Sequence, residues 1–312
     1  MRIVYPIVHA LFYTLSLLPF WALYLIADGF YLLVYRLIGY RKRVVRGNLV
    51  SSFPEKSIDE IKRIEREFYH FLCDYFVETL KLLSISPQKM LRHIEFRNVE
   101  EMERCFDEGQ HCAAILGHYC NWEYLSTTGL AFHRHPEAVM GLIYHPLYNK
   151  VFDRLFIDLR QHLGGVCVPK KDILRHLFTY QHEKRMTLFG YIADQTPKWE
   201  NIHLWLPFLN HDTPVFTNGE KIMRKMNNAV FYVDMERPRR GHYVVTFKLL
   251  TRTPRELEEF AITRQFFVLL EQTIRRAPQY YLWSHNRWKR THDEFDKRFT
   301  IEGGKVIPKK QS

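Results

Sequence analysis

The chain begins with an apolar stretch that is too long for an ordinary surface helix. From residue 3 to residue 38 the sequence is almost continuously apolar, interrupted only by His9, Asp28 and Arg36, with the helix-disturbing Pro19 in the middle. About 20 apolar residues are enough for one helix to cross a bilayer. The stretch therefore predicts a membrane-anchoring helix, tilted or kinked, with residues left over. A monotopic hairpin in one leaflet and a buried core helix with a solvated basic end are the alternatives.

Basic residues gather on one side of this stretch. Its carboxyl side carries Arg36, Arg41, Lys42, Arg43 and Arg46, whereas Arg2 alone precedes it. The positive-inside rule then places the remaining chain on the cytoplasmic face of the membrane, and the same cluster would attract anionic headgroups. The apolar run is longer than the hydrophobic region of a signal peptide, and no small-residue cleavage site closes it. We therefore expect the segment to stay on the mature protein.

The composition leaves the kind of partner open. With 312 residues, of which 46% are hydrophobic, the chain can bury a sizeable core, and we expect one catalytic domain with an appendage. A net charge of +11 favours an anionic partner, which can be a phospholipid surface, a phosphorylated substrate or a nucleic acid. The five cysteines are widely spaced and form no C-x-x-C pair, so neither a disulfide framework nor a zinc ribbon is indicated.

Beyond the apolar stretch, the pattern is that of an α/β domain. Residues 59–83 predict an amphipathic helix, and short apolar runs then alternate with helical patterns. The predicted strands are residues 112–116, 138–144, 186–192, 229–235 and 243–249. The predicted helices are residues 122–132, 151–163, 173–182, 217–225 and 257–276.

A histidine and a glutamate stand where the first of these strands ends. Gly117 and His118 break the buried run 112–116, and a helix is expected to begin near Trp122 with Asn121 as its N-cap. Five residues of regular helix would rotate the two side chains about 140° apart, so His118 is expected on the turn with Glu123 pointing back from the first helical turn. A carboxylate there can accept the imidazole N–H and leave the other ring nitrogen as a general base. A polar turn that merely feeds a helix would show the same spacing.

A second strand end adds another polar residue. Asp194 follows the strand predicted at residues 186–192, at the carboxyl end where ligands bind in open α/β sheets. His118 and Asp194 are therefore expected to face one crevice. An Asx-type turn before Pro197 is the alternative interpretation of Asp194.

Four segments, in this order, carry a resemblance to a known family. They are Gly117-His118 with Glu123, the run 191–197 (YIADQTP), the region 206–219 with Leu-Pro-Phe-Leu and Thr-Asn-Gly, and the run 277–289 (APQYYLWSHNRWK). Together they resemble the lipid A late acyltransferases, also called lauroyl or myristoyl acyltransferases, within the lysophospholipid and glycerolipid acyltransferase superfamily. The resemblance spans nearly the whole chain, and the last segment is its most specific part.

The resemblance implies a fold, a reaction and a location. It implies a central mixed β-sheet flanked by helices, with a membrane-anchoring segment at residues 1–46, an acyltransferase domain at residues 47–302 and a flexible tail at residues 303–312. It further implies transfer of a fatty acyl chain, from a thioester of acyl carrier protein or coenzyme A, to a hydroxyl of a phosphorylated lipid A precursor. No other cofactor, no metal and no nucleic acid is expected. The protein would lie in the bacterial inner membrane with its catalytic domain facing the cytoplasm.

The same resemblance assigns roles to individual residues. His118 would be the general base and Glu123 the acid that orients it. The residues expected to bind substrate or shape the site are Asp194, Arg287, Arg160, Asn121, Gln195 and His285. Family members usually carry Tyr-Arg-Pro after the third strand, whereas this chain has Tyr144-His145-Pro146, so that arginine's role passes to Arg154, to Arg160 or to no residue. Cys120 adjoins the base, but its position indicates packing and not a covalent nucleophile.

Other acceptors and other functional classes remain as alternatives to this prediction. The acceptor can instead be a lysophospholipid, a glycerol phosphate or an aminolipid. A nucleic-acid binder fits the charge but not the absence of a helix-turn-helix or RNP pattern, and a metal-dependent hydrolase lacks ligand spacing. The loop aromatics are expected either to line a groove for the acyl chain or to pack against the protein; they are Trp199, Trp205 and Phe208. The basic residues near 237–240 are expected at a solvated hairpin tip.

Overall fold

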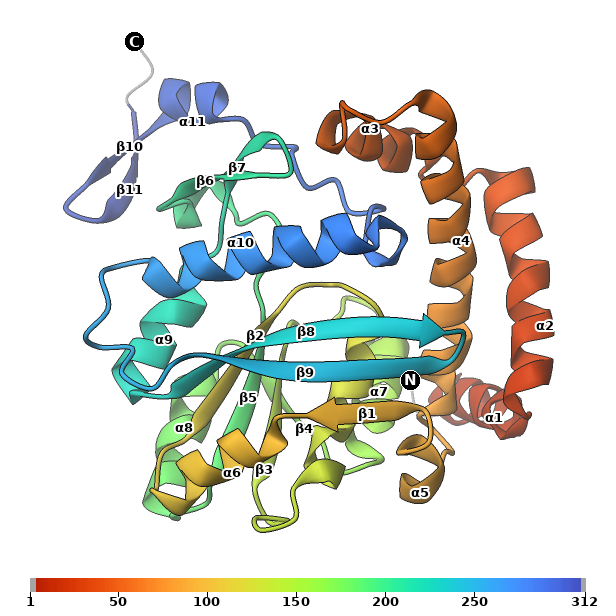
Figure 1. Cartoon of the computed structure of the whole chain (residues 1–312), viewed down its shortest axis with the longest axis horizontal. Coiled ribbons are helices and arrows are strands. Elements are labelled where there is room, and N and C mark those ends of the chain that lie inside the picture. Colours follow the sequence, from red (N-terminus) through yellow and green to blue (C-terminus); the bar gives the residue numbers. More distant parts are fainter. Residues whose placement is uncertain (1–3, 310–312) are drawn as a thin grey trace.

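The computed structural model describes residues 4–309, and its centre is a seven-stranded mixed sheet (Figure 1). The strand order is β1-β9-β8-β2-β5-β3-β4, with neighbours parallel throughout except for the antiparallel pair β8 and β9. The strands are β1 Ile94–Arg97, β2 Cys112–Leu116, β3 Val139–Tyr144, β4 Val166–Pro169, β5 Thr187–Ile192, β8 Ala229–Arg239 and β9 His242–Thr251. The predicted mixed sheet flanked by helices is confirmed.

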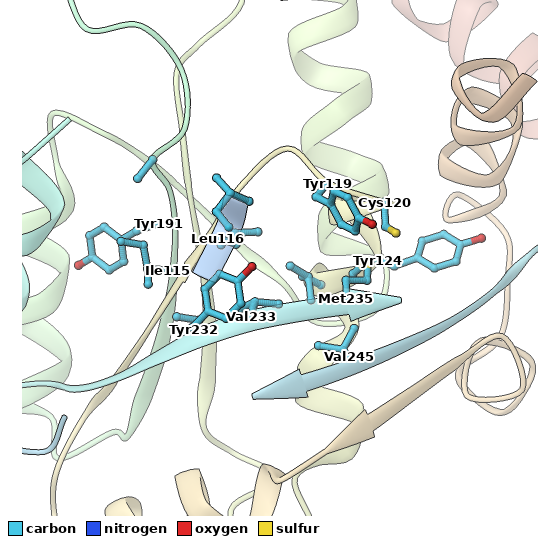
Figure 2. Packing of buried hydrophobic residues seen from close by; sticks show 14 of the residues in the cluster. Ile115, Leu116, Tyr119, Cys120, Tyr124, Tyr191, Tyr232, Val233, Met235 and Val245 are labelled. Atoms are coloured by element: carbon cyan, nitrogen blue, oxygen red, sulfur yellow. The ribbon is translucent and has the colours of Figure 1, made fainter. Parts of the chain in front are cut away.

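The centre of the sheet is buried on both faces. All five residues of β2 are buried, as expected for a parallel strand covered on both sides. Ile115 lies opposite Tyr191 on β5 and Tyr232 on β8, and Figure 2 shows these side chains packing around the strand. Helices α6 Val99–Asp107 and α10 Ala261–Arg276 both pack against β2. The central strand is thus a rigid base for the residues that follow it.

Apart from the two N-terminal helices, the other α-helices surround the sheet and its carboxyl edge. They are α3 Lys42–Ser52, α4 Ile58–Lys81, α5 Pro87–Met90, α7 Lys150–Gln161, α8 Ile173–His182, α9 Asn218–Met226 and α11 His292–Arg298. Helix α4 is the amphipathic helix predicted at residues 59–83. It begins with a capping box, in which Ser57 and Glu60 satisfy each other's backbone N–H groups. Two short hairpins complete the described chain, β6 Trp205–Phe208 with β7 His211–Pro214, and β10 Phe299–Glu302 with β11 Lys305–Pro308.

The apolar N-terminal stretch forms two helices separated at Pro19. Helix α1 Val4–Leu17 ends before this proline, and α2 Phe20–Tyr31 continues as a π-helical segment to Ile38. In the described residues, Phe20–Ile38 is the one helix long and apolar enough to cross a membrane. Its inner side packs along α4, while the outward residues Trp21 and Leu37 are 68% and 79% exposed. Residues 1–3, where the predicted stretch and its flanking Arg2 begin, lie outside the described residues.

Regular structure is present at both of the expected domain boundaries. The predicted boundary at residue 46 falls inside α3, which packs against α4 as part of one core. The tail expected from residue 303 instead contributes β11, which pairs with β10 in an antiparallel hairpin. Residues 310–312 of that tail lie outside the described residues.

The segment after His118 is a helix, but a different one from that predicted. Trp122–Ala131 forms a 3-10 helix instead of an α-helix. Ser126, Thr127 and Thr128 each donate a hydroxyl hydrogen bond to the carbonyl three residues earlier. Such side-chain bonds compete with the regular helical ladder, which gives a physical reason for the tighter geometry.

The loop aromatics pack instead of lining a groove. Trp199 and Trp205 lie against Phe295 in a small cluster around the C-terminal segment. Phe208 is 1% exposed and packs edge-on against Phe267 of α10.

Basic residues at the β8–β9 hairpin form ion pairs, whereas the sequence predicted a solvated tip. Arg237 is buried and donates to Asp74 at 2.7 Å and to Glu78 at 3.2 Å, both on α4. Arg240 bridges Asp74 and Asp28 of α2, each at 2.6 Å. We call these five residues the clamp, because they join α2, α4 and the hairpin. No local sequence pattern indicates these ion pairs, because the carboxylates come from helices more than 150 residues away.

Candidate active site

The site is set by the register of β2 and β5. These strands run parallel with Leu116 opposite Ile192, so the residues two positions beyond, His118 and Asp194, emerge side by side at the carboxyl edge of the sheet. Asp194 Oδ1 accepts a hydrogen bond from His118 Nδ1 at 2.7 Å, and its Oδ2 accepts one from the backbone N–H of His118 at 3.0 Å. The structure thus brings together the two strand-end residues that the sequence placed in one crevice.

Close packing beneath the turn holds this pair in place. A Cβ added at Gly117 would lie 2.8 Å from Leu270 of α10 and 3.4 Å from Asp194 Oδ2. A side chain at residue 117 would therefore have to displace Leu270. Trp122 adds an edge-on contact to the His118 ring, with ring centroids 4.9 Å apart. The imidazole is therefore fixed from below and from one side.

The environment keeps Asp194 ionised. Its side chain is 2% exposed, and burial alone would raise its pKa. The charge of His118, the two hydrogen bonds from His118 and the charge of Arg287 outweigh burial, so the pKa of Asp194 lies below its usual value. An ionised Asp194 accepts a hydrogen bond from Nδ1–H of His118, which leaves Nε2 as the unprotonated ring nitrogen.

His118 Nε2 faces the open side of the site. The His118 side chain is 17% exposed, and Gln195 Nε2 lies 3.2 Å from the ring nitrogen. Since Nδ1 holds the proton, the Gln195 amide donates to Nε2. A hydroxyl that displaced this amide would meet the basic nitrogen directly.

A cavity of about 400 Å³ opens beside this nitrogen. Apolar residues of β2, β3, β5, β8, β9, α7 and the Trp122–Ala131 helix make most of its wall. They include Leu116, Leu125, Met140, Leu142, Ile143, Phe156, Ile192, Val233 and Phe247. Its few charged or polar groups include His118, Glu123, Asp153 and Arg160. Apolar walls with a small number of convergent polar groups are typical of a ligand site.

Glu123 lies at the same cavity but is not bonded to His118. Its carboxylate is 4% exposed and receives two hydrogen bonds from Arg160, at 2.6 Å from Nε and 2.7 Å from Nη2. Tyr75 OH approaches the same carboxylate at 3.5 Å. The contact expected between Glu123 and the imidazole is therefore not present: Nδ1 of His118 bonds to Asp194, and Nε2 lies beside Gln195.

Arg160 rather than Arg154 occupies the inner position. Burial alone would lower the pKa of Arg160, but its ion pair with Glu123 outweighs burial and raises the pKa above its ordinary value. Arg154 is 61% exposed and pairs with Asp158 one helical turn away. Both arginines were predicted as replacements for the family's arginine, whose position is taken by His145 in this chain. Arg160 and His145 line the cavity.

Arg287 stands behind the pair instead of facing the cavity. It is 1% exposed, donates from Nη2 to the Pro214 carbonyl at 2.7 Å, and has no carboxylate within ion-pair distance among residues 4–309. Burial lowers its pKa to about 10, although the nearby Asp194 and Tyr281 oppose that shift. Its position suits support of Asp194 better than the predicted contact with a phosphorylated acceptor.

Two other predicted substrate contacts also lie outside the cavity wall. Asn121 is 0% exposed, donates to Glu78 at 3.3 Å and makes no side-chain capping bond, contrary to the N-cap expected there. His285 accepts a hydrogen bond from the Thr196 N–H at 3.4 Å, and burial lowers its pKa to about 4. Neither side chain lines the cavity beside His118.

Cys120 is a packing residue, as its position in the sequence indicated. It is 0% exposed, and burial raises its pKa well above the usual thiol value. A thiol held neutral in this way is not activated for nucleophilic attack. Its backbone adopts φ +52°, and its N–H donates to the Tyr280 carbonyl, which ties the turn to the C-terminal segment.

The fold and the site define an α/β protein that presents a histidine–carboxylate pair at the carboxyl ends of parallel strands. The chain belongs to the bacterial lipid A biosynthesis acyltransferase family, which matches residues 2–290. The match confirms the resemblance and assigns the chain to acyl transfer in lipid A biosynthesis. No curated protein matches the chain in sequence.

Proposed function

We propose that this protein moves a fatty acyl chain from the thioester of acyl carrier protein or coenzyme A to a hydroxyl of a lipid A precursor, with His118 as the general base. The observation that carries the proposal is the position of His118 between Asp194 and the cavity. Nδ1 donates a hydrogen bond to the buried carboxylate of Asp194, while Nε2 faces a cavity with largely apolar walls. A base of this kind removes the proton from a hydroxyl as it attacks.

The reaction follows from that geometry. Nε2 of His118 takes the proton of the acceptor hydroxyl while its oxygen bonds to the thioester carbonyl carbon. The tetrahedral intermediate collapses, the carbon–sulfur bond breaks, and the imidazolium returns its proton to the departing thiolate. Asp194 stabilises the imidazolium between these steps and keeps the ring in the productive tautomer. No covalent acyl-enzyme is needed, in keeping with the buried Cys120.

The cavity suits one end of the acyl chain. Its volume of about 400 Å³ and its apolar wall favour hydrocarbon, and Arg160 with Glu123 supplies a polar boundary close to His118. We assign to this boundary the polar part of a substrate, in place of the arginine missing at position 145. The exposed apolar sides of α1 and α2 support attachment to the inner membrane, with the sheet on the cytoplasmic side.

Lipid analysis of cells with and without the protein tests this function. Mass spectrometry of lipid A from a strain that lacks the chain should show one acyl chain fewer, and the wild-type sequence should restore it whereas His118→Ala should not. Purified protein offered labelled acyl carrier protein and acyl coenzyme A identifies the donor. If lipid A keeps its full set of acyl chains while a lysophospholipid, glycerol phosphate or aminolipid goes unacylated, the acceptor is that lipid instead.

A further inference from the structure

A second cavity lies where the N-terminal helices meet the domain. It has a volume of about 500 Å³ and shares no lining residue with the cavity beside His118. Its wall comes from the break between α1 and α2, the end of α4, α5, the residues before β1 and the β8–β9 hairpin. The lining residues are Pro19, Phe20, Lys81, Ile85, Lys89, Arg92, His93, Arg239 and His242.

The charged groups of this cavity are all basic. Lys81, Lys89, Arg92 and Arg239 line it, and no carboxylate does. None of these four cations forms an ion pair with a carboxylate among residues 4–309. Elsewhere on the same hairpin, Arg237 and Arg240 are each paired with carboxylates of the clamp. The cavity thus concentrates positive charge without internal compensation, which is favourable only if an anion binds or water screens the charges.

Two histidines are held within the same wall. His93 and His242 stack with ring centroids 4.9 Å apart, and His93 Nδ1 donates to the Gly241 carbonyl at 2.8 Å. Burial lowers the pKa of His93, and the neighbouring Arg92, Arg239 and Lys81 lower it further. Burial, Arg239 and His93 likewise lower the pKa of His242. Burial is the larger cause of both pKa shifts, and a bound anion would oppose the smaller part that comes from the neighbouring cations.

The surroundings of the cavity are apolar on the side of the N-terminal helices. Pro19 and Phe20 form part of its wall, and Leu17 and Trp21 next to them are 58% and 68% exposed. Lys81 fixes this corner by donating to the Ser16 and Leu18 carbonyls, at 2.6 and 2.7 Å. A basic cavity bordered by exposed apolar side chains fits a ligand with a charged head and hydrocarbon tails.

We propose that this cavity binds the phosphate group of an anionic membrane lipid, whose tails lie along the exposed apolar sides of α1 and α2. Lys89, Arg92 and Arg239 face the phosphate, and Lys81 closes the inner end. The bound lipid would hold the junction of the anchor and the domain at the headgroup level of the membrane. This role is separate from acyl transfer, so an inactive His118→Ala protein is expected to bind the lipid as wild type does.

The test titrates full-length protein in neutral detergent micelles with dioctanoyl phosphatidylglycerol and with dioctanoyl phosphatidylcholine. The double variant Arg92→Gln/Arg239→Gln removes two exposed cations of the cavity that have no ion-pair partner. The matched control Lys184→Gln/Arg264→Gln removes two exposed cations that line neither cavity. We expect the cavity variant to bind phosphatidylglycerol about tenfold or more weakly, with the control close to wild type. Melting temperatures check that both variants fold.

Three results would overturn the proposal. Equal affinity for the two lipids would show that the headgroup charge is not recognised. Equal weakening in both double variants would mean that diffuse charge, not this cavity, attracts the lipid. If inorganic phosphate bound wild type as tightly as the lipid and lost affinity only in the cavity variant, the ligand would be free phosphate and not a membrane lipid.

Discussion

Two clusters in this molecule contain buried carboxylates but do different things. The clamp joins Asp74 and Glu78 of α4 to Arg237 and Arg240 of the β8–β9 hairpin, and no clamp residue lines either cavity. At the carboxyl edge of the sheet, Asp194 also sits buried against a partner, but that partner, His118, turns its second nitrogen toward a cavity. A buried carboxylate alone is therefore no sign of catalysis. The difference lies in whether its partner directs a second polar atom toward a cavity that a substrate can enter.

The difference also appears in how the carboxylates are satisfied. Glu78 receives hydrogen bonds from Tyr24, Tyr243 and Asn121 in addition to Arg237. Such a saturated network holds elements together and has no capacity left for chemistry. Replacing residues of the clamp should therefore change stability, whereas replacing His118 or Asp194 should change rate. The predictions below test that division.

His118→Ala should have the largest effect on rate. Without the base, transfer from labelled acyl donor should fall by roughly 10⁴-fold, the upper end for general acid–base catalysis, while the melting temperature stays near that of wild type. His182→Ala, at an exposed histidine at the end of α8, is the control and should keep full activity. Near-normal turnover in His118→Ala would remove the general base from the mechanism.

Asp194→Asn should come next. An amide keeps the shape of the side chain but can no longer stabilise the imidazolium or fix its tautomer. Because the imidazole itself remains, kcat should fall by about 10³-fold, within the range of general acid–base catalysis. Stopped assays at saturating acceptor measure it. A loss confined to KM would mean that Asp194 only binds substrate.

Arg237→Met should lower the stability of the protein and leave its rate nearly unchanged. It leaves Asp74 and Glu78 buried without their cation, and loss of one partner of a buried pair costs about 3 kcal/mol or more. Thermal or denaturant unfolding should show this loss, while kcat per folded molecule stays within about twofold of wild type. A fall in kcat comparable to that of Asp194→Asn would break the distinction between the two clusters.

These expectations show which parts of the molecule the sequence could predict. The runs that became β2, β5 and α8 were visible because continuous apolar stretches or helical spacing mark them, and the strand-end argument brought Asp194 to His118. The strands β1 and β4 were missed because four residues are too few to show the alternation of apolar and polar side chains that marks a strand. Glu123 was given the wrong partner since Arg160 and Tyr75 reach it from α7 and α4, and no local pattern records such contacts.

Glu123→Gln should have a smaller effect than either His118 or Asp194. The amide loses the charge that holds Arg160, and a charge-assisted hydrogen bond of this kind contributes about 1.5 kcal/mol, or roughly tenfold. We expect this loss mainly in KM for the acceptor, because the pair borders the cavity without touching His118. Steady-state kinetics with both substrates varied would separate the two parameters, and Arg160→Gln should give a similar profile. A kcat as low as that of His118→Ala would restore Glu123 to the chemical step.

Asp28→Asn should have the smallest effect. Its ion pair with Arg240 is 46% and 40% exposed on the two sides, and exposed pairs contribute under about 1 kcal/mol. Unfolding should therefore shift only slightly, and less at high salt than at low salt. A loss as large as that of Arg237→Met would show that the junction of α2 with the hairpin, and not the buried part of the clamp, holds this region together.

The most direct test of the central claim is NMR of isotope-labelled histidine in the wild type, Asp194→Asn and Glu123→Gln proteins, recorded where His118 is neutral. The account predicts that His118 carries its proton on Nδ1 in the wild type, that Glu123→Gln preserves this tautomer and that Asp194→Asn loses it. A tautomer that survives in Asp194→Asn and changes in Glu123→Gln would contradict it, and would return the orienting role to Glu123.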